Sequence, residues 1–236
     1  MSYDLWYWPS VPGRGEFVRL ALEAAGVPYR DRARAADAQE LVEDMESRSG
    51  IKPFAPPYIV TGDGLAISQV AHILAWLGDR HGFGSDDPVL NVQLIQLQLD
   101  ITDIVAEVHD THHPLSTGEY YEDQKDAAKH RARDFRENRI PKYLDHFEQA
   151  AGAHEGPFVA GEQWSHVDTS LFLLIEGLHY AFPRAMAAIQ DNYPRLHALR
   201  DAVTEIEGVR DYRSSPRNLP FNEDGIFRHY PELDAQ

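Results

Sequence analysis

The first third of the chain alternates between short apolar runs with the period of a strand and longer runs with the period of a helix. Strand-like runs occur at YDLWYW, VPYRDRA and YIVTGDGLAIS, and a Gly-Asp-Gly turn divides the last of these into two strands. Helix-like runs occur at GRGEFVRLALEAAG, which Gly26 closes, at DAQELVEDMESRSG and at QVAHILAWLGDR. The order β-α-β-α-β-β-α predicts a compact mixed sheet with helices on its faces.

The rest of the chain has helical periodicity only, and it follows a short segment rich in Gly, Ser, Asp and Pro. We therefore predict an α/β domain over residues 1–81, a linker over residues 82–88 and an all-helical domain over residues 89–236. The fold class is α/β plus all-α. No internal repeat interrupts this organisation.

Three features of the helical part indicate where its helices bend or end. Pro141 is expected to kink a long helix, because proline lacks a backbone N–H. Ser165 and Asp168 have the spacing of a capping box before an apolar run, with Asp where Glu or Gln is usual, so a helix is predicted to begin there. From Arg213 onwards the pattern indicates an irregular tail.

The charge balance limits the partners that the protein is expected to bind. The chain has 22 Lys and Arg against 38 Asp and Glu, a formal net charge of −16, which repels phosphate backbones and anionic lipid surfaces. No apolar run approaches the ~20 residues that cross a bilayer, and MSYDLWYW lacks the basic and apolar regions of a signal peptide. We therefore expect no nucleic acid partner, no membrane partner and a cytoplasmic location.

The chain contains no cysteine, so it offers no thiol nucleophile, no disulfide and no thiolate metal ligand. Any sulfur chemistry has to use a sulfur atom that the substrate brings. This leaves hydroxyl groups, histidines and backbone groups as the candidates for chemistry.

Two hydroxyl groups, Tyr7 and Ser10, lie at the junction between the first predicted strand and helix. An aromatic residue in a strand is usually part of the core, and Ser-x-Pro usually marks a turn, so purely structural roles are the alternative. Arg14 follows at the positive end of the helix dipole, which favours binding of a carboxylate. An exposed, solvated arginine is equally ordinary there.

Two segments predict contacts to a peptide-like ligand. In FAPPYIV, Pro57 is a candidate for a cis peptide bond, which would leave the N–H and C=O of Tyr58 unpaired at a sheet edge. A trans Pro-Pro that stiffens a loop is the alternative. Gln69 lies at a predicted helix start, where side-chain and backbone N–H groups bind carboxylates, although an exposed polar residue is more common there.

Three histidines in EVHDTHHP, His109, His112 and His113, have the i, i+3 and i+4 spacing of one helical face. With Asp110 nearby, that spacing suits a metal ion. However, no cysteine and no second cluster of ligands accompany them, so no metal is expected. The favoured interpretation is polar residues that line a cleft, or a solvated helix end before Pro114.

Five motifs in the same order resemble those of the cytosolic glutathione S-transferases. YWPSVPGRGEFVRLALEAAG is similar to the first strand and helix of the mu, pi and sigma classes, and APPYIV to the cis-proline strand. SQVAHILAWLG, RIPKYLDHFE and FVAGEQWSHVDTSLF resemble three helical motifs of the family. The resemblance covers nearly the whole chain. It implies a thioredoxin-like domain followed by an all-helical domain, a homodimer, and conjugation of glutathione to small electrophiles in detoxification.

The resemblance also implies roles for individual residues. Tyr7 would be the hydroxyl that stabilises the glutathione thiolate, and His109, His112 and His113 would line the electrophile pocket. Trp8 and Arg14 would flank the glycyl end of glutathione, and Lys52 would reach its carboxylate. Tyr58, after Pro57, would pair its backbone with the cysteinyl part, and Gln69 and the N–H of Val70 would bind the γ-glutamyl end.

The chain departs from the family pattern at two positions. The turn after Tyr7 is one residue longer, and SVPGR resembles the Ser-x-Pro-x-Arg of the theta and delta classes, so Ser10 is the alternative catalytic hydroxyl. Val70 stands where the family has serine, and it offers only its backbone N–H. These departures make a non-catalytic ligand-binding protein of the same fold the alternative function. The three histidines suggest a further alternative, a histidine-based metalloenzyme.

Overall fold

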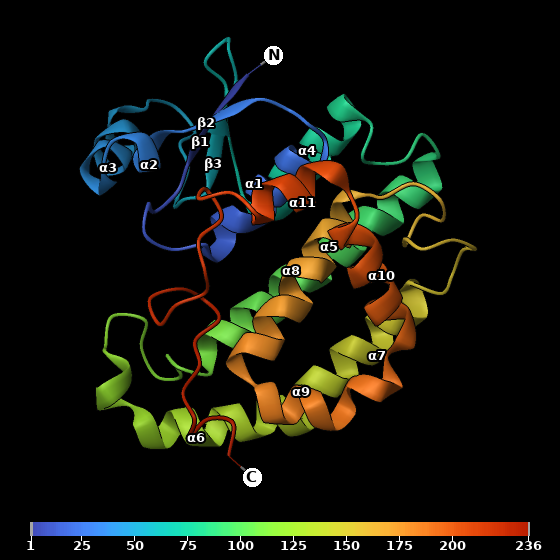
Figure 1. The fold of residues 1–236 in the computed structure, drawn as a ribbon. Helices are drawn as coiled ribbons and strands as arrows, with labels where there is room; N and C mark the ends of the chain where they lie inside the picture. Colours follow the sequence, from blue (N-terminus) through green and yellow to red (C-terminus); the bar gives the residue numbers. More distant parts are fainter. Residues whose placement is uncertain (1, 236) are drawn as a thin grey trace.

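The computed structural model describes residues 2–235, and its N-terminal part is built on a small mixed sheet (Figure 1). The four strands have the order β2-β1-β3-β4; β1 is parallel to β2 and antiparallel to β3, and β3 is antiparallel to β4. The elements are β1 (Tyr3–Trp6), α1 (Gly13–Ala24), β2 (Tyr29–Asp31), α2 (Arg32–Ala35), α3 (Ala38–Ser47), β3 (Tyr58–Val60), β4 (Ala66–Ser68) and α4 (Val70–His81).

Helices cover both faces of this sheet, as the alternation along β1 predicts. Tyr3 and Leu5 belong to the main hydrophobic core with the buried residues of α1 and α4, whereas Trp6 packs with Ala33 and Leu41 of α2 and α3. Successive strand residues face opposite sides of a sheet, so one strand anchors both helical layers (Figure 1). The thioredoxin-like arrangement expected for this domain is present.

One helix in this domain was not predicted. The run VPYRDRA forms a strand only over β2, and its last residues begin the four-residue helix α2. Asp37 then starts α3, because its side chain accepts a hydrogen bond from the backbone N–H of Glu40 at 3.0 Å. A short helix therefore stands where the pattern indicated the end of a strand.

The described chain from Pro88 to Arg213 is mainly helical. Its helices are α5 (Pro88–Asp110), α6 (Lys125–Asp134), α7 (Ile140–Ala150), α8 (His166–Ala181), α9 (Pro183–Ile189), α10 (Pro194–Thr204) and α11 (Glu207–Arg213). Neither α9 nor α11 was predicted, because seven residues are too few to establish a helical period. A π-helical turn, Phe135–Arg139, joins α6 to α7, and Pro141 is the second residue of α7. The helical run is therefore irregular in the turn that precedes this proline.

The capping box predicted for α8 is present. The Asp168 carboxylate accepts hydrogen bonds from the N–H and the hydroxyl of Ser165, both at 2.7 Å, and from the N–H of Val159 at 2.8 Å. Burial raises the pKa of Asp168 to about 6, and these hydrogen bonds oppose the rise. They fix the start of the central helix, which is buried over most of its length.

The two parts of the chain share one hydrophobic core, since the same cluster runs from α1 and α4 into α5 and α8. The tail after α11 has no regular structure, as predicted, but it runs back along the helical part (Figure 1). Asp234 accepts hydrogen bonds from the N–H groups of Arg184 and Ala185 at the start of α9. Within residues 2–235, no helix combines the length and apolarity needed to cross a bilayer.

Candidate active site

Tyr7 follows β1 directly, and its side chain is 5% exposed against the first turn of α1. Its hydroxyl oxygen accepts a hydrogen bond from the backbone N–H of Arg14 at 2.8 Å. A Cβ on Gly13 or on Gly15 would overlap the Tyr7 side chain, so the close approach requires glycine at both positions. Because the oxygen accepts from the backbone, the O–H of Tyr7 is left to donate to another group.

Burial is the largest influence on the Tyr7 phenol, and it raises the pKa above the ordinary tyrosine value. The N–H of Arg14 and the charges of Arg14 and Arg19 oppose this effect. The phenol is therefore protonated at neutral pH. It has the protonation state of a hydrogen-bond donor.

Ser10 lies in the turn between β1 and α1, and it is exposed. Its backbone carbonyl accepts a hydrogen bond from the Asn222 amide at 3.0 Å, which ties the C-terminal tail to this turn. The Ser10 hydroxyl itself has no hydrogen bond to any of residues 2–235. Of the two candidate hydroxyls, only that of Tyr7 is held in a defined position.

Arg14 and Val70 come together, although 55 residues of sequence separate them. They line a narrow cavity of about 20 Å³ with Gln98 and Thr102, between α1, α4 and α5. Gln98 is fully buried, and its carbonyl oxygen lies 3.0 Å from Ser170 Oγ and from His166 Nδ1. Its Nε2 has no hydrogen-bond partner among residues 2–235. No sequence signal pointed to Gln98, because a lone glutamine in a helix usually faces solvent.

Gln69 precedes α4 and has a φ of 71° with an exposed side chain. This left-handed conformation is unfavourable for a residue other than glycine, and such strain concentrates at functional sites. Val70 is the first residue of α4. The helix start predicted at this position is confirmed, and its backbone is strained.

The peptide bond between Pro56 and Pro57 is cis, but the predicted edge position of Tyr58 is wrong. Tyr58 lies in a central strand, where it pairs with Trp6 of β1 on one side and with Ser68 of β4 on the other. Its side chain packs inward and its hydroxyl donates to Asp44 at 2.7 Å. Pro56 has no N–H, so the residue before the cis bond offers only a carbonyl group to a ligand.

Two further candidates are exposed. Trp8 is 40% exposed beside Tyr7. The Lys52 ammonium lies 3.2 Å from the Glu46 carbonyl oxygen, and the residue lines a shallow depression with Arg48 and Leu65. None of the other candidate residues lines that depression.

The three histidines cluster as predicted, with ring centroids 4.9–5.1 Å apart, although α5 ends before His112 and His113. The Nε2–H of His112 donates to the carbonyl of Ile226 in the tail at 2.8 Å. Burial lowers the pKa of His109 to about 4 and that of His112 to about 3, with Arg228 adding to both effects. The imidazoles are therefore neutral at pH 7. Among residues 2–235, no group of His, Cys, Asp and Glu has a metal-binding arrangement.

The C-terminal tail borders this region, and sequence patterns gave no signal of that. Tyr230 stacks on Tyr121 with ring centroids 3.8 Å apart, and the Tyr121 hydroxyl donates to Glu232. Together with the contacts of the tail to Ser10 and His112, these interactions bring tail residues from Asn222 onwards beside the end of α5.

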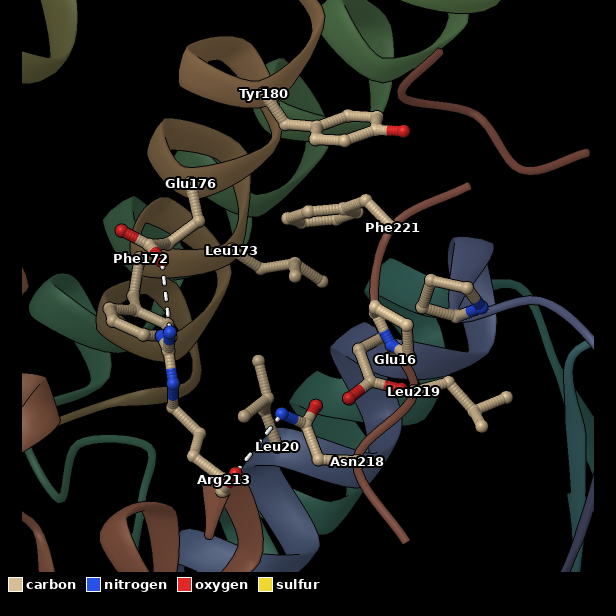
Figure 2. Close-up of a pocket in the computed structure, with 12 residues that line it drawn as sticks. Glu16, Leu20, Phe172, Leu173, Glu176, Tyr180, Arg213, Asn218, Leu219 and Phe221 are labelled. Carbon is tan, nitrogen blue, oxygen red and sulfur yellow. Dashed lines mark hydrogen bonds and ion pairs between the residues drawn. The ribbon is translucent and has the colours of Figure 1, made fainter. Parts of the chain in front are cut away.

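A larger cavity of about 290 Å³ lies between α1, α8, α11 and the tail (Figure 2). Tyr7 does not line it. The charged groups that line it already have partners: Glu176 pairs with Arg213 of the lining and with Arg200 outside it, and Glu16 pairs with Arg19 outside it. Because these charges are already paired, the cavity lining does not define the charge of a ligand.

Comparison with known proteins places this geometry in a family. Residues 109–216 match the family described as glutathione S-transferase, C-terminal domain. The chain is 24% identical over 209 residues to glutathione S-transferase A4 of Bos taurus, covering 87% of this chain and 86% of the relative. It is 24% identical over 227 residues to glutathione S-transferase A2 of Homo sapiens, covering 93% of both chains.

Solved structures show the same fold. A pi-class glutathione S-transferase of Onchocerca volvulus superposes with a TM-score of 0.73 and 19% identity, covering 95% of this chain and 99% of that one. Prostaglandin synthase D of Nilaparvata lugens superposes with a TM-score of 0.71 and 18% identity, covering 93% and 100%. Residues 109–216 therefore match the glutathione S-transferase C-terminal domain family, and the chain as a whole is similar to full-length glutathione S-transferases and has their fold.

Proposed function

We propose that the protein is a glutathione transferase, in which Tyr7 stabilises the thiolate of bound glutathione and the sulfur attacks a small electrophile. The observation that carries the proposal is the Tyr7 hydroxyl, which accepts from the Arg14 N–H and keeps its own O–H to donate. A cysteine-free protein needs a substrate that brings the sulfur, and glutathione does so.

The chemistry requires only a modest shift in acidity. A free thiol with a pKa of ~8.5 is a few per cent thiolate at neutral pH, and a hydrogen bond donated to sulfur favours the anion. The thiol proton leaves to solvent, and the sulfur lone pair forms a C–S bond to the electrophilic carbon. The leaving group then departs with its electron pair, or the electrons move onto a conjugated acceptor.

Glutathione would lie between Tyr7 and the start of α4. Arg14 and the N–H groups at Gln69 and Val70 are suited to the carboxylate of the γ-glutamyl end, because helix N-termini favour anions. Tyr58 contributes no free backbone group, since its strand is central. The Pro56 carbonyl would accept from the cysteinyl N–H instead, and Lys52 and Trp8 remain candidates for the glycyl end.

The electrophile would bind beside His109, with His112, His113 and the tail as further walls. Neutral imidazoles would give such a pocket polar groups without a fixed charge, and Arg14 lies close enough to lower the pKa of His109 further. A pocket of that kind suits small polarised electrophiles. A cytoplasmic location and a role in detoxification complete this proposal.

We further propose a homodimer in which the sheet domain of one copy contacts the helical domain of the other. Phe54, in the loop before the cis bond, is 92% exposed, and Ile51, three residues earlier, is fully exposed. An apolar cavity of about 160 Å³ lies between α5 and the end of α7, lined by Leu94, Leu97 and Val159 among others. An exposed phenylalanine and an apolar cavity of that size are complementary surfaces for two copies of one chain.

A non-catalytic protein that binds ligands through the same fold is the second candidate. Two observations favour it: Val70 has no side-chain donor, and Pro56 has no N–H. Both remove hydrogen bonds that a tripeptide would otherwise form.

Retention on immobilised glutathione, followed by turnover of 1-chloro-2,4-dinitrobenzene, tests the two functions. A transferase is retained and produces the conjugate above the uncatalysed rate. Retention without turnover would favour the second candidate. The absence of both retention and turnover would contradict the proposed function.

A further inference from the structure

Arg19 of α1 is fully buried beneath the proposed active site. Its Nε donates to the Asp31 carboxylate at 2.6 Å, and its Nη1 lies 3.2 Å from the Glu16 carboxylate. The same Nη1 donates to the Pro12 carbonyl at 3.3 Å. The guanidinium carbon lies 5.7 Å from the centroid of the Tyr7 ring. Arg19 therefore contacts the Tyr7 ring and also the turn that leads into α1.

The surroundings of Arg19 hold this charge in a fixed position. Arg34 lies 3.8 Å from the Glu16 carboxylate and 3.4 Å from that of Asp31, so two arginines and two carboxylates balance one another. The Tyr212 hydroxyl of α11 donates to Glu16 at 2.7 Å. A buried arginine with several partners is already ordered, so it loses little further freedom when the neighbouring tyrosine donates a hydrogen bond to the thiolate.

We propose that Arg19 is a positioning residue for Tyr7: it holds the first turn of α1 against the phenol and supplies a permanent positive charge beside the ring. The proposal rests on the proposed function, in which Tyr7 donates a hydrogen bond to the glutathione sulfur. The carbonyl that Arg19 binds belongs to Pro12, one residue before Gly13 and two before the N–H that contacts the Tyr7 oxygen. Without the Arg19–Pro12 hydrogen bond, the turn that places the Arg14 N–H against the Tyr7 hydroxyl is less firmly held.

The charge acts in the same direction as the geometry. When Tyr7 shares its proton with a thiolate, negative charge develops on the phenol oxygen, and a nearby cation stabilises it. Arg14 and Arg19 are the charged groups that lower the pKa of Tyr7, and Glu16, Asp31 and Arg34 surround Arg19 itself. Removal of the negative charge of Glu16 should therefore let Arg19 lower the pKa of Tyr7 further.

Glu16 also connects this network to the cavity between α1 and α8, which it lines (Figure 2). Tyr212 lies on α11 and donates to Glu16, so a residue far away in the sequence holds the carboxylate that pairs with Arg19. The influence of Arg19 on the pKa of Tyr7 consequently depends on the packing of α11 against α1.

The test compares Arg19→Met and Arg19→Lys with Arg32→Met as a matched control. Arg32 lies 5.2 Å from the Trp6 ring centroid, so it is an arginine over the aromatic residue next to Tyr7. The pKa of the bound glutathione thiol is titrated by thiolate absorbance. We expect Arg19→Met to raise this pKa by about one unit, a tenfold loss of thiolate below it, and Arg19→Lys to recover most of the shift. Arg32→Met should leave the pKa unchanged.

A second readout requires no glutathione. The phenol carbon signal of Tyr7, assigned by its loss in Tyr7→Phe, is titrated by NMR in the ¹³C-tyrosine-labelled protein. Arg19→Met should raise the pKa of Tyr7, and Glu16→Gln should lower it; the second variant serves if the first does not fold. If the proposed function is wrong, the pKa of the bound glutathione thiol should be unchanged in Tyr7→Phe. The titration of the Tyr7 phenol would still decide the role of Arg19. A lower melting temperature with an unmoved Tyr7 titration in the folded variants would overturn the proposal.

Discussion

Replacement of Tyr7 by phenylalanine tests the proposed mechanism with the smallest change in shape. The ring keeps its place against Gly13 and Gly15, because only the hydroxyl is removed. A hydrogen bond to a charged group contributes roughly 1.5–3 kcal/mol, which corresponds to about one to two pKa units on the bound thiol. We expect the pKa of the thiol to rise towards ~8.5 and the rate below that pH to fall by ~10², roughly 2.7 kcal/mol.

The structure also predicts a stability cost for this variant. The Arg14 N–H loses its acceptor at 2.8 Å, and an unpaired buried N–H costs about 1–3 kcal/mol. Activity of the native protein should rise with pH through the pKa of the bound thiol and then level off, because the thiolate is the reactive form. In Tyr7→Phe the same rise should occur at higher pH.

The assay is a pH series of kcat/KM with 1-chloro-2,4-dinitrobenzene, together with titration of the thiolate absorbance of bound glutathione. Ser10→Ala is the matched control: it also removes one hydroxyl, and the Ser10 backbone carbonyl, not the side chain, holds Asn222. This control should change neither the pKa nor the rate by more than about twofold. A normal pH profile in Tyr7→Phe, with loss of activity in Ser10→Ala, would refute the reasoning and assign the role to Ser10.

Three further predictions concern the site, its pH dependence and the assembly. Gly15→Ala should lower the melting temperature and the rate, because its Cβ would overlap the Tyr7 ring; an unchanged protein would contradict the close packing. The buried His112 has a folded pKa of about 3 against ~6.5 unfolded, so it stabilises the fold above pH 6.5 and this contribution is lost as pH falls towards 3. Urea denaturation should show that the unfolding free energy decreases from pH 7 to pH 5 in both proteins, but by about 2 kcal/mol less in His112→Gln than in the native protein. Equal decreases in the two proteins would rule this out. Phe54→Ser should shift a dimer towards monomer in light scattering while Tyr120→Ser, at a residue also well exposed, should not; a native protein of 26.8 kDa in solution would exclude the dimer.

Local patterns in the sequence were sufficient for most of the elements. The alternation in YDLWYW, the capping residues Ser165 and Asp168 and the glycines beside Tyr7 act over a few residues, and the structure contains each predicted element around them. Periodicity and capping are short-range effects, so a stretch of sequence determines them with little help from the rest of the chain.

Only the tertiary structure decided which groups meet. Tyr58 is central because β4 pairs on its far side, and nothing within the strand itself distinguishes a central from an edge position. The contacts of Asn222 with Ser10 and of Ile226 with His112 join residues more than one hundred positions apart, and they depend on how the tail packs. The charge beside Tyr7 likewise depends on the packing of α1 against β1, because burial and partners, not residue type alone, determine what Arg19 does.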